Sequence, residues 1–179
     1  MHNMITEQTN SENPSLHWKY INCKGRISLD LGCGRWETVE YRDPNWPTTP
    51  EYLIQQGATE VRAFDIDPAE IDWYTTNITP KMAVFPECMA VRTVEDIRSI
   101  MKKYAPKAIK CDIEGAEQVF LELSDEEFCS IDHYALETHS TAIYDAFVQR
   151  FNDLNYEIIA VIDLVHAPPM KAIFAEKKR

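Results

Sequence analysis

The sequence predicts a three-layer α/β fold built on a mostly parallel sheet of about seven strands. Short apolar segments alternate with longer, helix-like segments along most of the chain, and glycines follow the first of these apolar segments directly. The 179 residues are enough for one domain with its own core. Residues 1–15 are polar and are expected to form a mobile arm, which leaves 16–179 as the single domain.

Capping residues and prolines set the expected elements. Strands are expected over 26–31, 60–65, 81–85, 108–112 and 131–138. Helices are expected over 49–56, 67–77, 94–104 and 140–154. Thr49, Asp67 and Thr93 are the expected caps, and Pro86 is expected to end the third strand. Residues 156–163 and 170–176 are expected to close the sheet as an antiparallel edge hairpin, because only a short loop joins them.

The overall charge is acidic, with 29 Asp and Glu against 18 Lys and Arg and a net charge of −11. Since tight binding to nucleic acid or anionic membrane depends on basic side chains, neither partner is expected. The N-terminus lacks the apolar core of a signal peptide, and no apolar run approaches the length of a membrane span. Five cysteines without a CxxC pair indicate a reducing compartment, so a cytoplasmic protein is predicted.

The segment Asp30-Leu31-Gly32-Cys33-Gly34 is the first candidate ligand site. Glycines let a ligand approach the backbone closely, although a simple tight turn has the same composition. The position of the third glycine in a dinucleotide-binding loop is occupied by Glu37, which would repel a pyrophosphate and disfavours a nicotinamide-dependent oxidoreductase. A loop rich in acids suits a cationic ligand without phosphate, such as S-adenosylmethionine.

Each residue of this region has an expected role toward that cofactor. Gly32, Cys33 and Gly34 would form the loop against it, and Asp30 would meet its ammonium group directly or through water. Asp65, at the end of the second strand, would accept hydrogen bonds from both ribose hydroxyls, and Ile66 would pack on the adenine. Glu87 is a candidate for the adenine edge.

These residues resemble the first motif, D/E-x-G-x-G, of class I S-adenosylmethionine-dependent methyltransferases. Residues 110–117, Lys-Cys-Asp-Ile-Glu-Gly-Ala-Glu, resemble the K-x-D-x-E-G-x-E signature of the FkbM family, and residues 93–96 and 137–139 resemble further segments of that family. The resemblance implies a Rossmann-like methyltransferase fold and methylation of a small-molecule or saccharide hydroxyl. A cofactor-binding module without catalysis remains the alternative.

Two pairs of side chains are expected to converge beside the methyl group. Asp112 and Glu114 follow the fourth strand, Glu137 and His139 follow the fifth, and positions two apart in extended chain face the same side. His139 is the expected general base, because an unperturbed imidazole titrates near neutral pH. Asp112 or Glu114 would orient it, accept the proton or hold the acceptor.

Structural roles for these groups stay open. The alternative role of Glu114 is a helix cap, that of His139 is a structural hydrogen-bond partner, and Glu117 is expected to be a solvated or structural acid. The four groups of the two pairs could also bind a divalent cation in a metal-assisted methyltransferase, but no spacing typical of a metal site is present, so no metal is predicted.

The acceptor would be selected outside this core. The segment 36–50 contains three prolines and two tryptophans, and it is either a lid over the donor or a surface excursion. The N-terminal arm or a second subunit of a homodimer would be the other sources of acceptor contacts.

Overall fold

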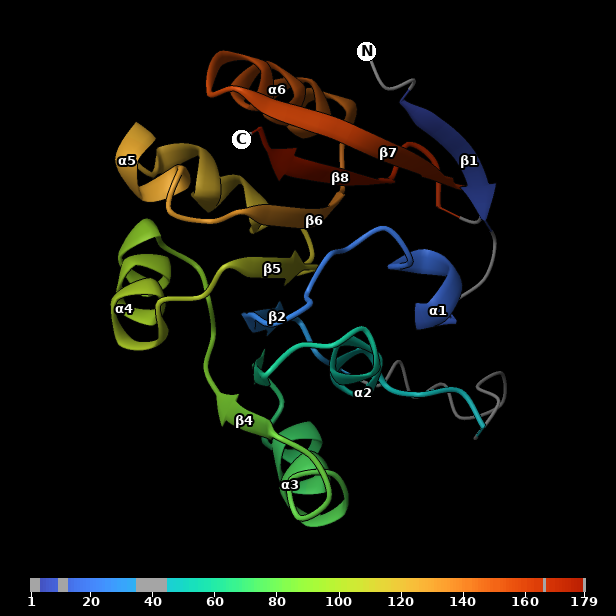
Figure 1. Cartoon of the computed structure of the whole chain (residues 1–179), viewed down its shortest axis with the longest axis vertical. Helices are drawn as coiled ribbons and strands as arrows, with labels where there is room; N and C mark the ends of the chain where they lie inside the picture. Colours follow the sequence, from blue (N-terminus) through green and yellow to red (C-terminus); the bar gives the residue numbers. More distant parts are fainter. Residues whose placement is uncertain (1–3, 10–12, 35–44, 166, 179) are drawn as a thin grey trace.

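The computed structural model describes residues 4–9, 13–34, 45–165 and 167–178. They form one eight-stranded sheet in the order β1-β7-β8-β6-β5-β2-β3-β4. In Figure 1 the sheet runs from β7 near the top, through β8, β6, β5 and β2, to β4 near the bottom. All neighbouring pairs are parallel except β6–β8 and β7–β8. The expected α/β fold, mostly parallel with antiparallel C-terminal strands, is confirmed.

The strands are β1 (Ile5–Thr9), β2 (Ile27–Leu31), β3 (Glu60–Asp65), β4 (Val84–Cys88), β5 (Ala108–Cys111), β6 (His133–Thr138), β7 (Tyr156–Leu164) and β8 (Lys171–Lys177). The α-helices are α1 (Pro14–His17), α2 (Thr49–Gln55), α3 (Pro68–Asn77), α4 (Val94–Tyr104), α5 (Asp125–Phe128) and α6 (Thr141–Asp153), and a 3₁₀ helix, η1 (Glu117–Glu122), follows β5.

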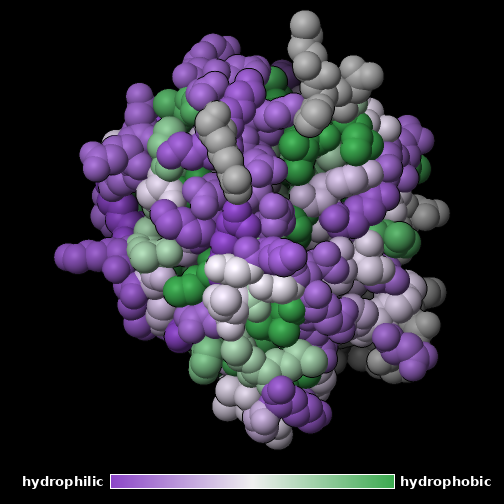
Figure 2. Space-filling model, viewed as in Figure 1, coloured by the Kyte–Doolittle hydropathy of each residue, from purple (hydrophilic) through white to green (hydrophobic). Residues whose placement is uncertain are grey.

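The sheet separates two hydrophobic cores, because successive side chains of a strand point to opposite faces. Ile109 of β5 packs with the apolar residues of α4, η1, α5 and α6, whereas Ala108 packs with those of α2 and α3. Figure 2 shows hydrophilic side chains over most of one face of the molecule, with hydrophobic ones in smaller patches between them. No helix within the described ranges is long and apolar enough to cross a membrane.

Helix starts follow the expected capping chemistry with one shift. Asp67 and Thr93 cap α3 and α4 through their side chains, as expected. The cap of α2 is Thr48 and not Thr49, because Thr48 and Glu51 form a reciprocal capping box.

Residues 1–15, expected to form a mobile arm, contain an ordered strand and the start of a helix. β1 pairs in parallel with β7 and closes the edge that the C-terminal hairpin would otherwise expose. Glu7 anchors it by accepting a hydrogen bond from Tyr20. Its side chains are mostly exposed, so backbone pairing at a sheet edge, and not an apolar pattern, orders this strand.

The prediction that Pro86 ends the third expected strand is wrong. Pro86 lies inside β4, and β4 pairs only with β3. Proline lacks a backbone N–H and is tolerated in an edge strand, where one side of the strand needs no donor.

The turn after β2 brings three strands together at the ligand end of the sheet. β2 lies between β3 and β5, and the chain passes from one side of β2 to the other after β4, which is the topological switch point of an open α/β sheet. The backbone N–H groups of Gly32 and Cys33 both donate to Phe64 O, at 2.9 and 3.1 Å. Gly32 has φ of +75°, and a Cβ built there would lie 1.7 Å from the carbonyl oxygen of Asp112. Only glycine fits at this close approach between the turn after β2 and the backbone of Asp112.

The substitution Gly32→Ala should therefore destabilise the fold far more than Gly25→Ala. Gly25 has nearly the same φ, +71°, but open space around its Cβ position, so its substitution costs only the left-handed backbone penalty of about 1–2 kcal/mol. Gly32→Ala adds a clash with backbone that has to move, and we expect a loss beyond about 4 kcal/mol. Urea unfolding of both variants measures the difference, and equal losses would contradict the packing described here.

Candidate methyl-donor and acid-cluster site

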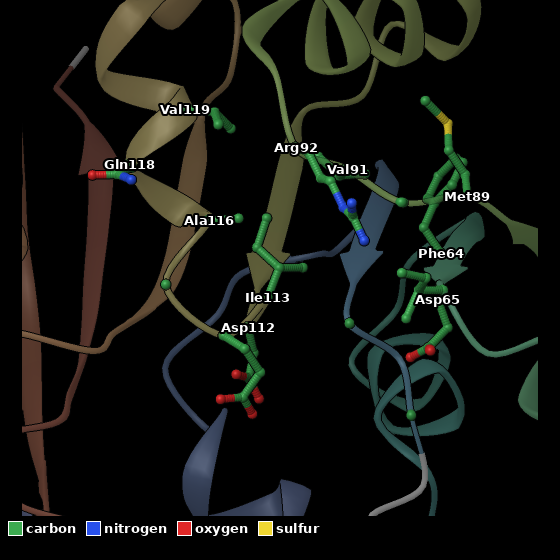
Figure 3. Close-up of a pocket in the computed structure, with 16 residues that line it drawn as sticks. Phe64, Asp65, Met89, Val91, Arg92, Asp112, Ile113, Ala116, Gln118 and Val119 are labelled. Carbon is green, nitrogen blue, oxygen red and sulfur yellow. The ribbon is translucent and has the colours of Figure 1, made fainter.

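A cavity of about 600 Å³ opens at the carboxyl ends of β2, β3, β4 and β5. Its walls come from the end of β3, from the residues that follow the four strands and from η1, as Figure 3 shows. They are Gly32, Gly34, Phe64, Asp65, Ile66, Met89, Ala90, Val91, Arg92, Asp112, Ile113, Glu114, Gly115, Ala116, Gln118 and Val119. A volume of this size is typical of sites that enclose a nucleoside-sized ligand.

Asp65 and Ile66 stand where a nucleoside is expected. Asp65 Oδ1 accepts a hydrogen bond from the backbone N–H of Asp67 at 2.9 Å, which fixes the carboxylate, and Asp65 Oδ2 faces Gly34. In Figure 3 the carboxylates of Asp65 and Asp112 are directed toward the same end of the cavity. The Ile66 side chain is 58% exposed at the cavity wall, although it is apolar.

Asp30 lies beneath the glycine turn and not in the cavity wall. It is completely buried, and its Oδ1 lies 2.9 Å from Lys110 Nζ, which is itself only 2% exposed. Lys110 also donates to the carbonyl oxygen of Gly32 at 2.6 Å. Burial raises the pKa of the Asp30 carboxyl, and the charge of Lys110 opposes that rise. Direct contact between Asp30 and a cofactor is therefore not available in this structure.

Cys33 and Glu87 also lie outside the cavity wall. The Cys33 side chain is buried, and its carbonyl oxygen accepts a hydrogen bond from Tyr74 at 2.7 Å. Glu87 pairs with Lys103 at 3.0 Å on the surface. Residues Met89 to Arg92, which follow β4, line the cavity in place of Glu87, and no sequence motif marks them.

Asp112, Glu114, Glu137 and His139 converge as the spacing predicted. His139 Nε2 lies 3.5 Å from Glu114, 3.7 Å from Glu137 and 3.8 Å from Asp112. Glu114 holds the left-handed backbone conformation, with φ of +52°, a strained state for a residue with a side chain and one that clusters at functional sites.

Burial and charge perturb the titration of this cluster. The pKa of Asp112 is raised to about 7, mainly by burial; the charge of Lys110 opposes this rise, and the nearby Glu137 carboxylate adds to it. Burial by itself would lower the pKa of His139, but the hydrogen bond and the charge of Glu117 outweigh it and raise the pKa to about 9. The carboxylates around the ring therefore favour its protonated form.

Glu117, expected as a solvated or structural acid, and His17, for which no role was expected, both contact the cluster. Glu117 is fully buried, and its Oε1 lies 3.1 Å from His139 Nδ1. Glu117 is the last position of the 110–117 signature, which was the only sign in the sequence of a role for it. A sequence pattern does not show that this side chain is fully buried. His17, at the end of α1, lies 3.0 Å from Glu137 Oε2, and no motif surrounds it.

A second, smaller cavity of about 180 Å³ adjoins the first and shares Gly32, Gly34, Asp112 and Glu114 with it. Glu137, His17, Trp18 and Met170 complete much of its wall. The segment expected as a lid, 36–50, is described only from residue 45, so most of it, with Glu37, lies outside the described residues.

Comparisons with solved structures place this arrangement among methyltransferase folds. A Streptococcus pneumoniae protein, Sp1610, described as a candidate tRNA (m1A22) methyltransferase in complex with S-adenosyl-L-methionine, has a TM-score of 0.62 at 13% identity over 96% of this chain and 74% of its own. A candidate S-adenosylmethionine-dependent methyltransferase from Listeria monocytogenes gives 0.59 at 14% over 93% and 99%. The m1A22 tRNA methyltransferase of B. subtilis gives 0.55 at 14% over 95% and 67%. The fold is therefore the Rossmann-like fold of class I methyltransferases.

The sequence comparisons add no closer assignment. No family model matches the chain, and no curated protein matches it. The FkbM resemblance thus rests on the motif residues alone.

The prediction that nucleic acid is excluded as a partner is contradicted. The structures that share this fold include those named as tRNA methyltransferases, so the fold itself is used on RNA. The inference from a net charge of −11 failed because a net charge describes the whole surface and not the part that meets a substrate.

The buried Lys110–Asp30 pair yields a stability prediction. Lys110→Met leaves the Asp30 charge buried without a partner, and we expect a loss of about 3–5 kcal/mol in the free energy of unfolding at neutral pH. The double variant Asp30→Leu/Lys110→Met should recover most of that loss, because it buries no charge. Lys102→Met, at an exposed lysine, is the control and should stay within about 0.5 kcal/mol of the wild type. A similarly small loss for Lys110→Met would contradict the role given to the pair.

Proposed function

We propose that this protein is an S-adenosylmethionine-dependent methyltransferase that binds the cofactor in the 600 Å³ cavity. The observation that carries the proposal is the joint placement of Asp65, the glycine turn and the acid cluster around one cavity at the switch point of the sheet. The fold shared with a cofactor-bound structure supports it.

The cavity residues suit the groups of this cofactor one by one. Asp65 offers a fixed carboxylate to the two ribose hydroxyls, and Ile66 offers an exposed apolar side chain to the adenine. Gly32 and Gly34 leave room for the methionine part, since neither carries a side chain. Asp112 and Glu114 place negative charge at the end of the cavity that would face the sulfonium and ammonium groups.

The cofactor supplies an electrophilic methyl group on a positively charged sulfur. The residues of this chain then hold an acceptor in line with the carbon–sulfur bond, which lowers the barrier by removing the entropy of alignment. The cofactor would supply the methyl group and keep the electrons of the broken bond, and a carboxylate of the cluster would take the proton that the acceptor loses. We propose Asp112, Glu114, Glu137 and His139 as the groups at this position.

Two lines of support point to different acceptors. The names of the structural neighbours support RNA. The resemblance of residues 110–117 to the FkbM signature implies a hydroxyl of a small molecule or saccharide, and the comparisons lend that class no support.

Methyl transfer from labelled cofactor separates these classes. The protein is incubated with S-adenosylmethionine carrying a labelled methyl group, once with mixed tRNA and once with a panel of sugars and phenols. We expect label in one of the two pools. Binding of the cofactor by calorimetry without transfer to either pool would favour a binding module, and no binding would overturn the proposal.

Asp65→Asn should weaken cofactor binding by about tenfold to a hundredfold, because a hydrogen bond to a charged group contributes about 1.5–3 kcal/mol. The asparagine keeps the oxygen that accepts from Asp67, so the turn itself should persist. Asp72→Asn on the exposed side of α3 removes the same charge as a control. Calorimetry with S-adenosylmethionine measures all three proteins, and equal affinities for wild type and Asp65→Asn would exclude Asp65 from the site.

A further inference from the structure

Glu117 fixes the ring of His139 in one orientation. Glu117 is 0% exposed, and its Oε1 accepts the backbone N–H of His139 at 2.9 Å and lies 3.1 Å from Nδ1 of the same residue. A buried carboxylate on one ring nitrogen is the usual support of a histidine that binds a metal through the other. The ring thereby directs Nε2 away from Glu117 and toward the acid cluster.

Nε2 faces three carboxylates without forming a hydrogen bond to any of them. It is inaccessible to solvent and lacks a hydrogen-bond partner. Its distances to Glu114 Oε2, Glu137 Oε1 and Asp112 Oδ1 are 3.5, 3.7 and 3.8 Å, beyond the roughly 2.7–3.2 Å of an N–H···O bond. Two ligand atoms that share a tetrahedral cation with bonds of about 2.1 Å lie about 3.4 Å apart. The spacing is close to that of atoms arranged around an ion.

Asp112 provides a second group without a partner. Its side chain is only 12% exposed, and its Oδ1 is inaccessible to solvent and accepts no hydrogen bond. One ligand atom from each of Asp112, Glu114 and His139 lies within 4.8 Å of the others. Lys110, the nearest fixed cation, is committed to Asp30 and to the Gly32 carbonyl.

We propose that Asp112, Glu114 and His139 bind a divalent transition-metal cation, with Glu117 as the positioning residue. A set of one imidazole and several carboxylates suits Mn²⁺, Fe²⁺ or Zn²⁺ better than the all-oxygen sites of Ca²⁺ and Mg²⁺. A bound cation would balance the charge of the surrounding carboxylates.

The cation would act on the methyl acceptor, a role that rests on the proposed function. Asp112 and Glu114 line both cavities, so an ion on them lies where the donor and acceptor cavities meet. An oxygen or nitrogen of the acceptor bound to the ion would lose its proton more readily, because a cation stabilises the deprotonated form. Binding of the ion itself does not depend on this role.

Mn²⁺ binding to the full chain tests the inference. The protein is treated with a chelator, freed of it, and titrated with MnCl₂ while free Mn²⁺ is followed by electron paramagnetic resonance. We expect one saturable site in the wild type. Asp112→Asn and His139→Gln should each weaken it at least tenfold, and Glu117→Gln should weaken it by about tenfold to a hundredfold. Glu126→Gln, at an exposed acid of α5, removes the same charge and should bind like the wild type.

Three outcomes decide the matter. Saturable binding that the cluster variants lose and Glu126→Gln keeps supports the site. Binding weaker than about 1 mM in the wild type, or equal binding by all variants, overturns it and leaves His139 as a protonated partner of the carboxylates. If a buried variant fails to fold by circular dichroism, Glu114→Gln carries the test, because that side chain is 70% exposed. Calorimetry of the metal-free protein with S-adenosylmethionine tests the proposed function separately.

Discussion

The ion pair between Lys110 and Asp30 holds the ligand end of the sheet together. It joins the neighbouring strands β2 and β5 inside the protein, and through Gly32 O it also holds the turn that contributes to the cavity wall. A buried pair of this kind adds little net stability, but each charge depends on the other. Asp30, the first acid of the D-x-G-x-G motif, thus supports the glycine turn from the protein interior. The shape of the cavity depends on this buried ion pair and not on a contact between Asp30 and a ligand.

The remaining acids differ in what balances their charge. Asp65 is fixed by a backbone N–H, whereas Glu117 and Glu137 face imidazoles. Asp112 and Glu114 lie near His139 at distances too long for hydrogen bonds, and the charge of Lys110 also acts on Asp112. Carboxylates without a close hydrogen-bonded partner are therefore concentrated at the junction of the two cavities. That location is where a cationic donor, a metal ion or both would lower the energy of the site most.

The sequence predicted the parallel strands, the caps of α3 and α4, and the convergence of Glu137 and His139 with Asp112, because strand ends and capping residues act locally. It did not predict β1, which is ordered by backbone pairing with a distant strand. It also wrongly ended a strand at Pro86, because a proline is tolerated inside a strand only where that strand lies at a sheet edge. The burial of Asp30 and the pairing of His17 with Glu137 are contacts between remote segments, which no local pattern encodes.

The size of the smaller cavity also explains why composition could not identify the acceptor. If the acceptor of the proposed reaction enters this cavity, a space of about 180 Å³ would hold its reacting group and little of what is attached to it. The remainder of a larger acceptor would then lie outside, against surfaces near α1 and the segment between β7 and β8, which supply His17, Trp18 and Met170 to the wall. Acceptor choice would depend on local surfaces around a small opening, and a net charge summed over 179 residues says little about them.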